Sequence, residues 1–341
     1  MPSSLSILLF FLGLLACLFR DGSSVPVCIT KAHGTCEGGV LENCLFRNAS
    51  AENPVQPACG RSWKGWAWPT RWVITNIGRA RYLCIPKAGS MSIRAGMAKF
   101  HEVYPDGMRS RPGKDTGRLS PMGPFAKTEH LLAGNASRYL SFTFVAEPIQ
   151  HLIGGFLETP RFVSVELMRR FLTQWICLGS LRPLLPPNTR IPGMKCDVHR
   201  TPQLLILENA AAEAQQLFHR GLRDTPSPFD FVGHLESVSS EWDLLRAMIQ
   251  QKSGAQLPAL PHTNNKSPRR VVLGLYGNVA TMPRGYARGL CAVLKSEYTC
   301  LGYQFPRQCT DEGGRFDVTV DEVQAFCSSE SAFLFSPSGQ P

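Results

Sequence analysis

Short apolar runs alternate along this chain with stretches in which apolar residues recur at helical spacing. The runs at 81–85, 139–146 and 229–235 are short and rich in aromatic and branched side chains, which predicts buried strands. A loop and a helical pattern follow each run, and after the third run apolar residues from Trp242 to Ile249 share one helical face. Repeated strand, loop and helix units indicate an α/β domain with a central parallel sheet. The same spacing predicts helices over 91–100, 165–178, 208–220 and 284–298, and an apolar helix that ends at Phe156.

An uncharged apolar run of fifteen residues, 5–19, stands near the amino terminus and is followed by Arg20 and Asp21. Its length is typical of a signal-peptide core and short for a membrane-spanning helix, which needs about 20 residues. No basic residue precedes the run, and no clear small-residue cleavage site follows it. Residues 1–23 are therefore either a cleaved signal peptide or a short type II membrane anchor. Both alternatives place the rest of the chain in the secretory pathway.

The cysteine content agrees with an oxidising compartment. Of the twelve cysteines, Cys17 lies in the leader, and the other eleven predict several disulfides. Because eleven is odd, at least one is a thiol or pairs between molecules, and Cys84 in an apolar run is the candidate for a buried thiol. No C-x-x-C pair occurs, which disfavours a zinc site. Sequons at Asn48, Asn135 and Asn265 agree with a lumenal glycoprotein.

The composition divides the chain into four parts. After the leader, residues 24–75 hold four cysteines and a tryptophan cluster between positions 63 and 72, which predicts a disulfide-stapled lead-in or stem. The tryptophans either stack on sugars or bases or pack against the main domain, and packing is the simpler interpretation. Residues 76–310 are predicted to form the α/β domain, and residues 311–341 a C-terminal extension and tail.

The charge balance narrows the class of ligand. The formal net charge is +10 and the isoelectric point is about 9.1, which suits nucleotides, sulfated or carboxylated glycans and other acidic ligands. Basic residues occur singly or in pairs, such as Arg169 with Arg170, so a diffuse basic surface is the simplest interpretation. No basic run is dense enough for a nucleic-acid-binding arm, and nucleic acid is not expected as a partner.

The clearest chemical signal is the segment 84–94, CIPKAGSMSIR, between a predicted strand and a predicted helix. Amide groups at the start of a helix and the small Gly89 let an anion approach the backbone. The hydroxyls of Ser90 and Ser92 and the ammonium of Lys87 complete a cradle for phosphate or sulfate, although the serines are equally consistent with helix capping alone. In a nucleoside triphosphate loop, GxxxxGK[ST], the lysine stands at the end. Lys87 stands at the start, which disfavours kinase or NTPase chemistry.

Four later segments accompany this loop, and the order and spacing of all five are informative. The five segments are IPKAGSMSI at 85–93, FTFVAEPIQHLIGGF at 142–156, DVHRTPQ at 197–203, FDFVGHLE at 229–236 and YTCLGYQFP at 298–306. Together they resemble the membrane-bound carbohydrate sulfotransferases of the Golgi. These enzymes transfer a sulfuryl group from 3′-phosphoadenosine 5′-phosphosulfate (PAPS) to hydroxyl groups of glycans.

The resemblance implies a P-loop-like three-layer sandwich with a central parallel sheet, preceded by the disulfide-stapled lead-in. It also implies a glycan acceptor, PAPS as the sulfuryl donor and no metal. The protein would reside in the Golgi lumen or membrane, or be secreted if the leader is cleaved. By the resemblance, the 5′-phosphosulfate would be held by the loop residues Lys87, Ala88, Gly89, Ser90, Met91 and Ser92.

Sulfuryl transfer needs a cation beside the bridging and terminal oxygens and a base that takes the proton of the acceptor hydroxyl. Lys87 would supply the cation. His199, in the DVHRTPQ segment, and His130, between the two nucleotide-binding segments, are the candidates for the base. Glu147, which precedes Pro148, is expected to cap a helix or to pair with an arginine.

The second segment departs from the family pattern at the two positions that hold the 3′-phosphate in the family and at His151, where the family has a second arginine. The arginine and the serine that hold the 3′-phosphate in the family fall on Ala146 and Gly154 here. Loss of a charge-assisted hydrogen bond would weaken PAPS binding by about 10- to 100-fold unless Arg138, Arg161 or His151 replaces it. Two interpretations therefore stay open. The chain is either a PAPS-dependent carbohydrate sulfotransferase or a catalytically inactive protein of the same fold that binds an acidic glycan or a protein partner.

Overall fold

The computed structural model describes residues 28–29, 40–47, 72–75, 80–90, 92–93, 139–158, 164–181, 199–222, 226–260 and 274–330. These residues form a mixed α/β structure that divides into two compact units. Unit 1 contains the described residues of Met1–Phe46, Trp68–Val145 and Glu208–Thr263. Unit 2 contains the described residues of Arg47–Ala67, Ala146–Leu207 and Asn264–Pro341.

A five-stranded sheet organises unit 1. Its strands are β1 (Cys28–Ile29), β2 (Trp72–Thr75), β3 (Ala80–Leu83), β4 (Leu140–Val145) and β5 (Phe231–His234). The order in the sheet is β1-β5-β4-β3-β2. Strands β3, β4 and β5 are parallel, β1 is parallel to β5, and β2 is antiparallel to β3. Parallel strands end at the same edge of a sheet, so the connections that follow β3, β4 and β5 all leave from one edge.

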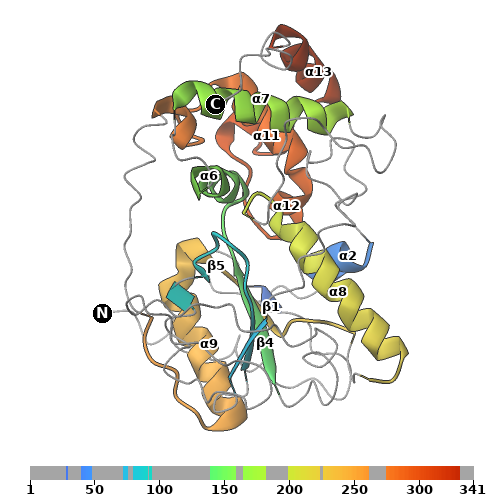
Figure 1. Cartoon of the computed structure of the whole chain (residues 1–341), viewed down its shortest axis with the longest axis vertical. Coiled ribbons are helices and arrows are strands. Elements are labelled where there is room, and N and C mark those ends of the chain that lie inside the picture. Colours follow the sequence, from blue (N-terminus) through green and yellow to red (C-terminus); the bar gives the residue numbers. More distant parts are fainter. Residues whose placement is uncertain are drawn as a thin grey trace, which may run out of the picture. The chain divides into compact units, whose positions relative to one another are not determined.

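The core of unit 1 is aromatic. Phe142 of β4 is in register with Tyr82 of β3 and with Phe231 of β5. The ring centroid of Phe142 lies 5.3 Å from that of Tyr82 and 6.4 Å from that of Trp242 in helix α9 (Val238–Ser253). All four side chains are buried, and α9 runs along the sheet in Figure 1. Burial of these large rings explains why the apolar runs fold as strands of a covered sheet.

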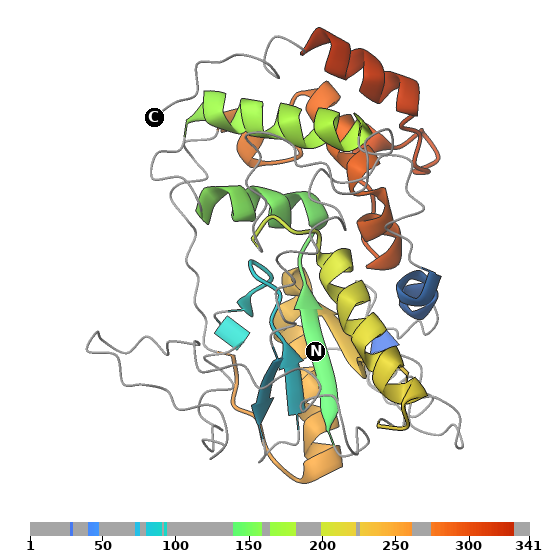
Figure 2. The same cartoon turned by 45° about the vertical axis from the view of Figure 1, so that its right-hand side comes forward.

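Unit 2 is built mainly from helices. Three of them, α7 (Val165–Leu181), α11 (Arg284–Val293) and α13 (Val320–Ser329), pack against one another, as Figure 2 shows. A Cβ at Gly285 of α11 would lie 2.8 Å from Phe326 of α13, and one at Gly289 would lie 2.8 Å from Ile176 of α7. Glycine at both positions therefore allows α11 to approach its two neighbours closely.

The other described helical elements of the two units are α2 (Val40–Arg47), α6 (Pro148–Glu158), α8 (Gln203–His219), α12 (Lys295–Cys300), η3 (Leu235–Ser237), η4 (Gly274–Gly277) and η5 (Arg307–Cys309).

Disulfides reinforce the helices of unit 2, as the cysteine content predicts. Cys177 of α7 is bonded to Cys327 of α13, with a Cα–Cα distance of 5.3 Å. Cys291 of α11 is bonded to Cys309 of η5, with a Cα–Cα distance of 6.3 Å. Disulfide bonds also include Cys44 and Cys300. Cys84 carries a thiol, as predicted, although it is half-buried rather than fully buried.

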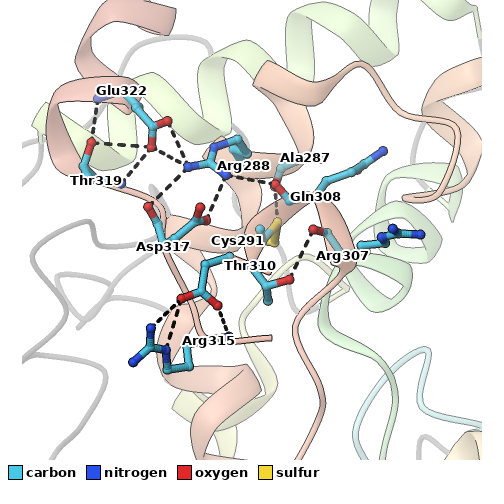
Figure 3. Close-up of polar contacts among 12 residues, drawn as sticks. Ala287, Arg288, Cys291, Arg307, Gln308, Thr310, Arg315, Asp317, Thr319 and Glu322 are labelled. Carbon is cyan, nitrogen blue, oxygen red and sulfur yellow. Dashed lines mark hydrogen bonds and ion pairs between the residues drawn. A yellow bond between two sulfur atoms is a disulfide. The ribbon is translucent and has the colours of Figure 1, made fainter. Parts of the chain in front are cut away.

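Arg288 of α11 holds the segment that leads into α13 (Figure 3). Its guanidinium donates hydrogen bonds to the carboxylates of Asp317 at 2.9 Å and Glu322 at 2.7 Å and to the carbonyl of Gln308 at 3.1 Å. Thr319 and Glu322 form a capping box at the start of α13. The Arg288 guanidinium lowers the pKa of the Glu322 carboxyl group, and the capping hydrogen bond from Thr319 lowers it further. This network is structural, because each partner belongs to the framework of unit 2.

The hydrophobic pattern locates the main elements but not all of their ends. The three predicted strands are confirmed as β3, β4 and β5, and two predicted helices as α7 and α9. Helix α8 begins at Gln203 rather than at residue 208, because a tertiary contact of Gln203, described below, adds a first turn that periodicity does not reveal. The predicted helix 284–298 is divided at Leu294 into α11 and α12, and α13 forms within the predicted C-terminal extension.

Several of the sequence predictions fall on residues that the structure does not describe. These are the apolar run 5–19, most of the lead-in 24–75, the three sequons and the predicted helix 91–100 beyond Ile93. They stay predictions. Within the described ranges, no helix is both long and apolar enough to cross a membrane.

Candidate functional site

The loop between β3 and the following helical turn adopts a strained conformation. Lys87 has φ +66° and is the one residue other than glycine with a positive φ in the part of the chain that the structure describes. Gly89, two positions later, has φ +69°. A left-handed conformation costs a non-glycine residue about 1 kcal/mol and persists where the surrounding structure imposes it, commonly at ligand sites. The turn at 87–89 is therefore held by its packing and not by the local preference of lysine.

Gly89 is the point at which this loop touches the end of β5. A Cβ at position 89 would lie 2.5 Å from Cδ1 of Leu235, the residue that follows β5. The left-handed φ and this close approach both require glycine. Two of the five segments identified in the sequence, 85–93 and 229–236, thus meet in unit 1.

The loop buries its apolar residues and leaves its polar residues partly accessible. Ala88 is fully buried, and its N–H donates to the carbonyl of Ile85 at 3.3 Å. Lys87, Ser90 and Ser92 are half-buried. A left-handed turn that carries an ammonium and two hydroxyls before a helix is an arrangement that binds phosphate or sulfate.

A buried histidine–glutamate pair fixes the end of β5. The backbone N–H of His234 donates to the Glu241 carboxylate, and His234 Nδ1 lies 3.5 Å from its other oxygen. A Cβ at Gly233 would lie 2.5 Å from the Phe144 ring and 2.6 Å from Glu241, so α9 and β4 close tightly around the strand end. The sequence prediction missed Glu241, because a glutamate in an amphipathic helix carries no motif. Its contact depends on how α9 packs.

In unit 2, a side-chain amide binds the residue that directly follows β4. The N–H of Ala146 donates to Oε1 of Gln203 at 2.7 Å, and Nε2 of Gln203 donates back to the carbonyl of Ala146 at 2.7 Å. Gln203 is fully buried and Ala146 is 4% exposed. The amide therefore satisfies both backbone groups of Ala146 in the way that a neighbouring strand would.

Glu147, the next residue, occupies the start of α6. One carboxylate oxygen accepts the N–H of Gln150 at 2.6 Å, and the other accepts the hydroxyl of Tyr298 in α12. Burial and the neighbouring carboxylate raise the pKa of Tyr298 well above its ordinary range, so its hydroxyl stays protonated and donates. The prediction that Glu147 caps a helix is confirmed, and Tyr298 is a partner that the sequence did not indicate.

Two further contacts complete the joining of three segments in unit 2. Oε1 of the buried Glu297 accepts the N–H of Leu204 in the first turn of α8, at 2.8 Å. A Cβ at Gly155 of α6 would lie 1.8 Å from the carbonyl oxygen of His199. The described unit 2 parts of the three segments, 146–156, 199–203 and 298–306, therefore meet around the starts of α6 and α8.

The predicted site residues fall into three groups. Lys87, with the loop residues around it, lies in unit 1, whereas Ala146, Gly154 and His199 lie in unit 2. Gly154 and His199 are half-buried. The residues that fall outside the described part of the chain are Met91, His130, Arg138 and Arg161.

The residues present fit one end of PAPS and not the other. The half-buried ammonium and hydroxyls of the β3 loop suit a 5′-phosphosulfate. At the end of β4, Ala146 has neither a polar side chain nor a backbone group left for a 3′-phosphate, because Gln203 binds both. His151, the one basic side chain in 140–158, is 2% exposed.

No cluster of three or more His, Cys, Asp or Glu side chains suited to a metal ion occurs within the described ranges. Comparisons with family models, with curated proteins and with solved structures find no match for this chain.

Proposed function

We propose that this chain is a sulfotransferase that transfers a sulfuryl group from PAPS to a hydroxyl group of a glycan in the secretory pathway. One observation carries the proposal: the left-handed turn at 87–89, with its lysine, is held against Leu235 between a parallel strand and a helical turn. The net charge of +10 agrees with an acidic substrate, and the disulfides agree with an oxidising compartment.

In finer terms, we propose that unit 1 is the core of a P-loop-like sandwich. Three parallel strands, β3, β4 and β5, support this proposal, because ligands of α/β proteins commonly bind at the carboxyl ends of such strands. The loop of Lys87 leaves from that edge. An antiparallel strand at one side of the sheet, here β2, is common in folds of this class.

The loop side chains account for anion recognition and for charge stabilisation during transfer. In this transfer the bond from sulfur to the bridging oxygen breaks, sulfur bonds to the acceptor oxygen, the hydroxyl proton goes to a base, and the nucleotide leaves with its 5′-phosphate. The Lys87 ammonium would stabilise charge on the bridging oxygen, and Ser90 and Ser92 would donate to the terminal oxygens. His199 and His130 stay the candidates for the base.

The end of β4 favours a second candidate function. Ala146 stands where the resemblance expects an arginine, and Gln203 binds its backbone on both sides. A protein that has lost nucleotide affinity in this way would keep a basic surface suited to acidic ligands. The second candidate is therefore a catalytically inactive sulfotransferase-fold protein that binds an acidic glycan or a protein partner.

Titration calorimetry of the purified full chain with 3′-phosphoadenosine 5′-phosphate tests the site. Replacement Lys87→Ala removes a charge-assisted hydrogen bond and is expected to weaken binding by about 10- to 100-fold. Lys295→Ala is the matched control, because it removes the same charge from an exposed lysine of unit 2, and it is expected to leave affinity unchanged. Equal affinity in the wild type and in Lys87→Ala would overturn the assignment of this loop.

Lys87→Gly separates the ammonium from the backbone strain. Glycine relieves the left-handed conformation, so the free energy of unfolding should stay the same or rise by up to about 1 kcal/mol, while nucleotide affinity falls as in Lys87→Ala. Transfer of labelled sulfuryl groups from PAPS to a mixture of glycans then distinguishes the two functions. Turnover that both Lys87 variants lose would support the enzyme, and glycan binding without turnover would support the second candidate.

A further inference from the structure

The connection after β4 is closed by hydrogen bonds to side chains of the protein. It leaves a parallel strand and enters α6, which is the position of an anion site in many α/β proteins. Ala146 has both backbone groups bonded to Gln203 at 2.7 Å. Pro148, at the first position of α6, has no N–H to offer.

The remaining N–H groups in the first turn of α6 also have partners. Ile149 forms a backbone hydrogen bond with the Tyr298 hydroxyl. Gln150 donates to the Glu147 carboxylate at 2.6 Å, and His151 donates to the Glu147 carbonyl at 2.8 Å. The carboxylate of Glu147 thus already stands where an external anion would be held.

Within the described part of the chain, the charges around this helix end do not favour a phosphate either. Residues 140–158 contain no lysine or arginine. Arg200 contacts the far part of α6, with its guanidinium carbon 5.9 Å from the Phe156 ring centroid and 5.0 Å from that of Phe171. Phe156 lies about two helical turns, roughly 12 Å, beyond Pro148.

We infer that the nucleotide is recognised through its 5′ end and that a 3′-phosphate adds no affinity, so the donor class includes adenosine 5′-phosphosulfate as well as PAPS. This inference depends on the proposed function. It concerns the specificity of the same transfer: the sulfur–oxygen bond to the 5′-phosphate breaks, sulfur bonds to the acceptor oxygen, and adenosine 5′-phosphate leaves in place of its 3′-phosphorylated form. The hydroxyl proton again goes to a base of the protein.

Calorimetry of the purified full chain with adenosine 5′-phosphate and with 3′-phosphoadenosine 5′-phosphate tests the inference. We expect dissociation constants within about threefold of each other, both weakened by Lys87→Ala. A site that holds the 3′-phosphate by charge-assisted hydrogen bonds would favour the second nucleotide by about 10-fold or more. Such a preference, with binding still dependent on Lys87, would overturn this inference and leave the proposed function intact. Binding of neither nucleotide would overturn the proposed function, and this inference with it.

The variant Glu147→Gln provides a second test, which distinguishes an effect of the carboxylate charge on nucleotide preference from a purely structural effect. Glutamine keeps an acceptor for the Gln150 N–H but removes the negative charge, so the affinity ratio should shift severalfold toward the 3′-phosphorylated nucleotide. A loss of structure would weaken both nucleotides equally and leave the ratio unchanged. Glu166→Gln, which removes an exposed carboxylate from α7, is the matched control. An unchanged ratio in Glu147→Gln would overturn the role of this carboxylate in excluding the 3′-phosphate.

Discussion

The connections that follow β3 and β4 begin alike and end differently. Both leave the carboxyl end of a parallel strand and enter a helix. After β3, a left-handed turn leaves Lys87 and two serines half-buried. After β4, the side chains of Gln203 and Glu147 form hydrogen bonds with the backbone of the connection, and Tyr298 donates a hydrogen bond to Glu147. One topology can therefore form either a loop with accessible polar side chains or a closed structural joint, and the side-chain partners decide which.

The connections after β3 and β4 also differ in backbone strain. The β3 connection contains two residues with positive φ, whereas none of the described residues 139–158 has one. A strained turn holds its N–H groups away from ordinary helical or sheet partners, and ligand sites use such turns. The β4 connection instead satisfies its groups internally, which contributes to stability and leaves little for a ligand.

The largest expected effect comes from opening the closed joint with Gln203→Leu. This change leaves the buried N–H and carbonyl of Ala146 without partners, and each unsatisfied group costs about 1–3 kcal/mol. The free energy of unfolding should fall by about 2–5 kcal/mol, measured by urea denaturation. Gln216→Leu removes an exposed glutamine from the same helix and should change it by less than about 0.5 kcal/mol. Similar small effects of both variants would contradict a closed joint at Ala146.

A smaller effect is expected at the open loop from Gly89→Ala. The new Cβ must adopt a left-handed φ and would lie 2.5 Å from Leu235, so unfolding free energy should fall by about 1–3 kcal/mol. Nucleotide affinity should fall with it, because the turn that positions Lys87 shifts. The double variant with Leu235→Ala relieves the steric part and should recover some of both losses. If the second substitution only adds to the first, the contact between Gly89 and Leu235 does not shape the loop.

The smallest expected effect is a dependence of the free energy of unfolding on pH, which is caused by the buried hydroxyl of Tyr298 in the closed joint. Burial, with a further contribution from Glu147, raises its pKa far above the ordinary 10.0, so above pH 10 the unfolded chain releases a proton that the folded chain retains. Stability is therefore fully present below pH 10 and falls above it, by up to about 1.4 kcal/mol per pH unit for one tyrosine.

Denaturation curves between pH 9 and 12 check this prediction. Tyr298→Phe should reduce the slope from about pH 10 up to pH 12. Burial raises the pKa of Tyr286 to about 12, so the part of the slope that Tyr286→Phe removes should shrink as the pH approaches 12, whereas the part that Tyr298→Phe removes should not. A slope that Tyr298→Phe leaves unaltered would show that this hydroxyl is accessible and that the joint opens.

Much of the framework follows from local patterns in the sequence. Three apolar runs became parallel strands because their aromatic and branched side chains need a covered sheet, and the cysteine content correctly indicated disulfides. The loop that follows β3 was predicted from residue types alone, and its role in anion binding stays a prediction. Its left-handed backbone was not foreseen, because lysine has no local preference for that conformation.

The difference between the two connections lies beyond the reach of any local pattern. Ala146 and Gln203 are 57 positions apart, and Glu147 and Tyr298 are 151 positions apart. Neither glutamine nor tyrosine signals such a partner in sequence, because a hydrogen bond depends on distance and direction in space rather than on spacing along the chain. The positions of the strands and of the Lys87 loop could therefore be predicted from local patterns in the sequence. Which connection leaves polar side chains accessible and which binds its own polar groups was determined by tertiary contacts: those of α9 in unit 1, and those of α6, α12 and the first turn of α8 in unit 2.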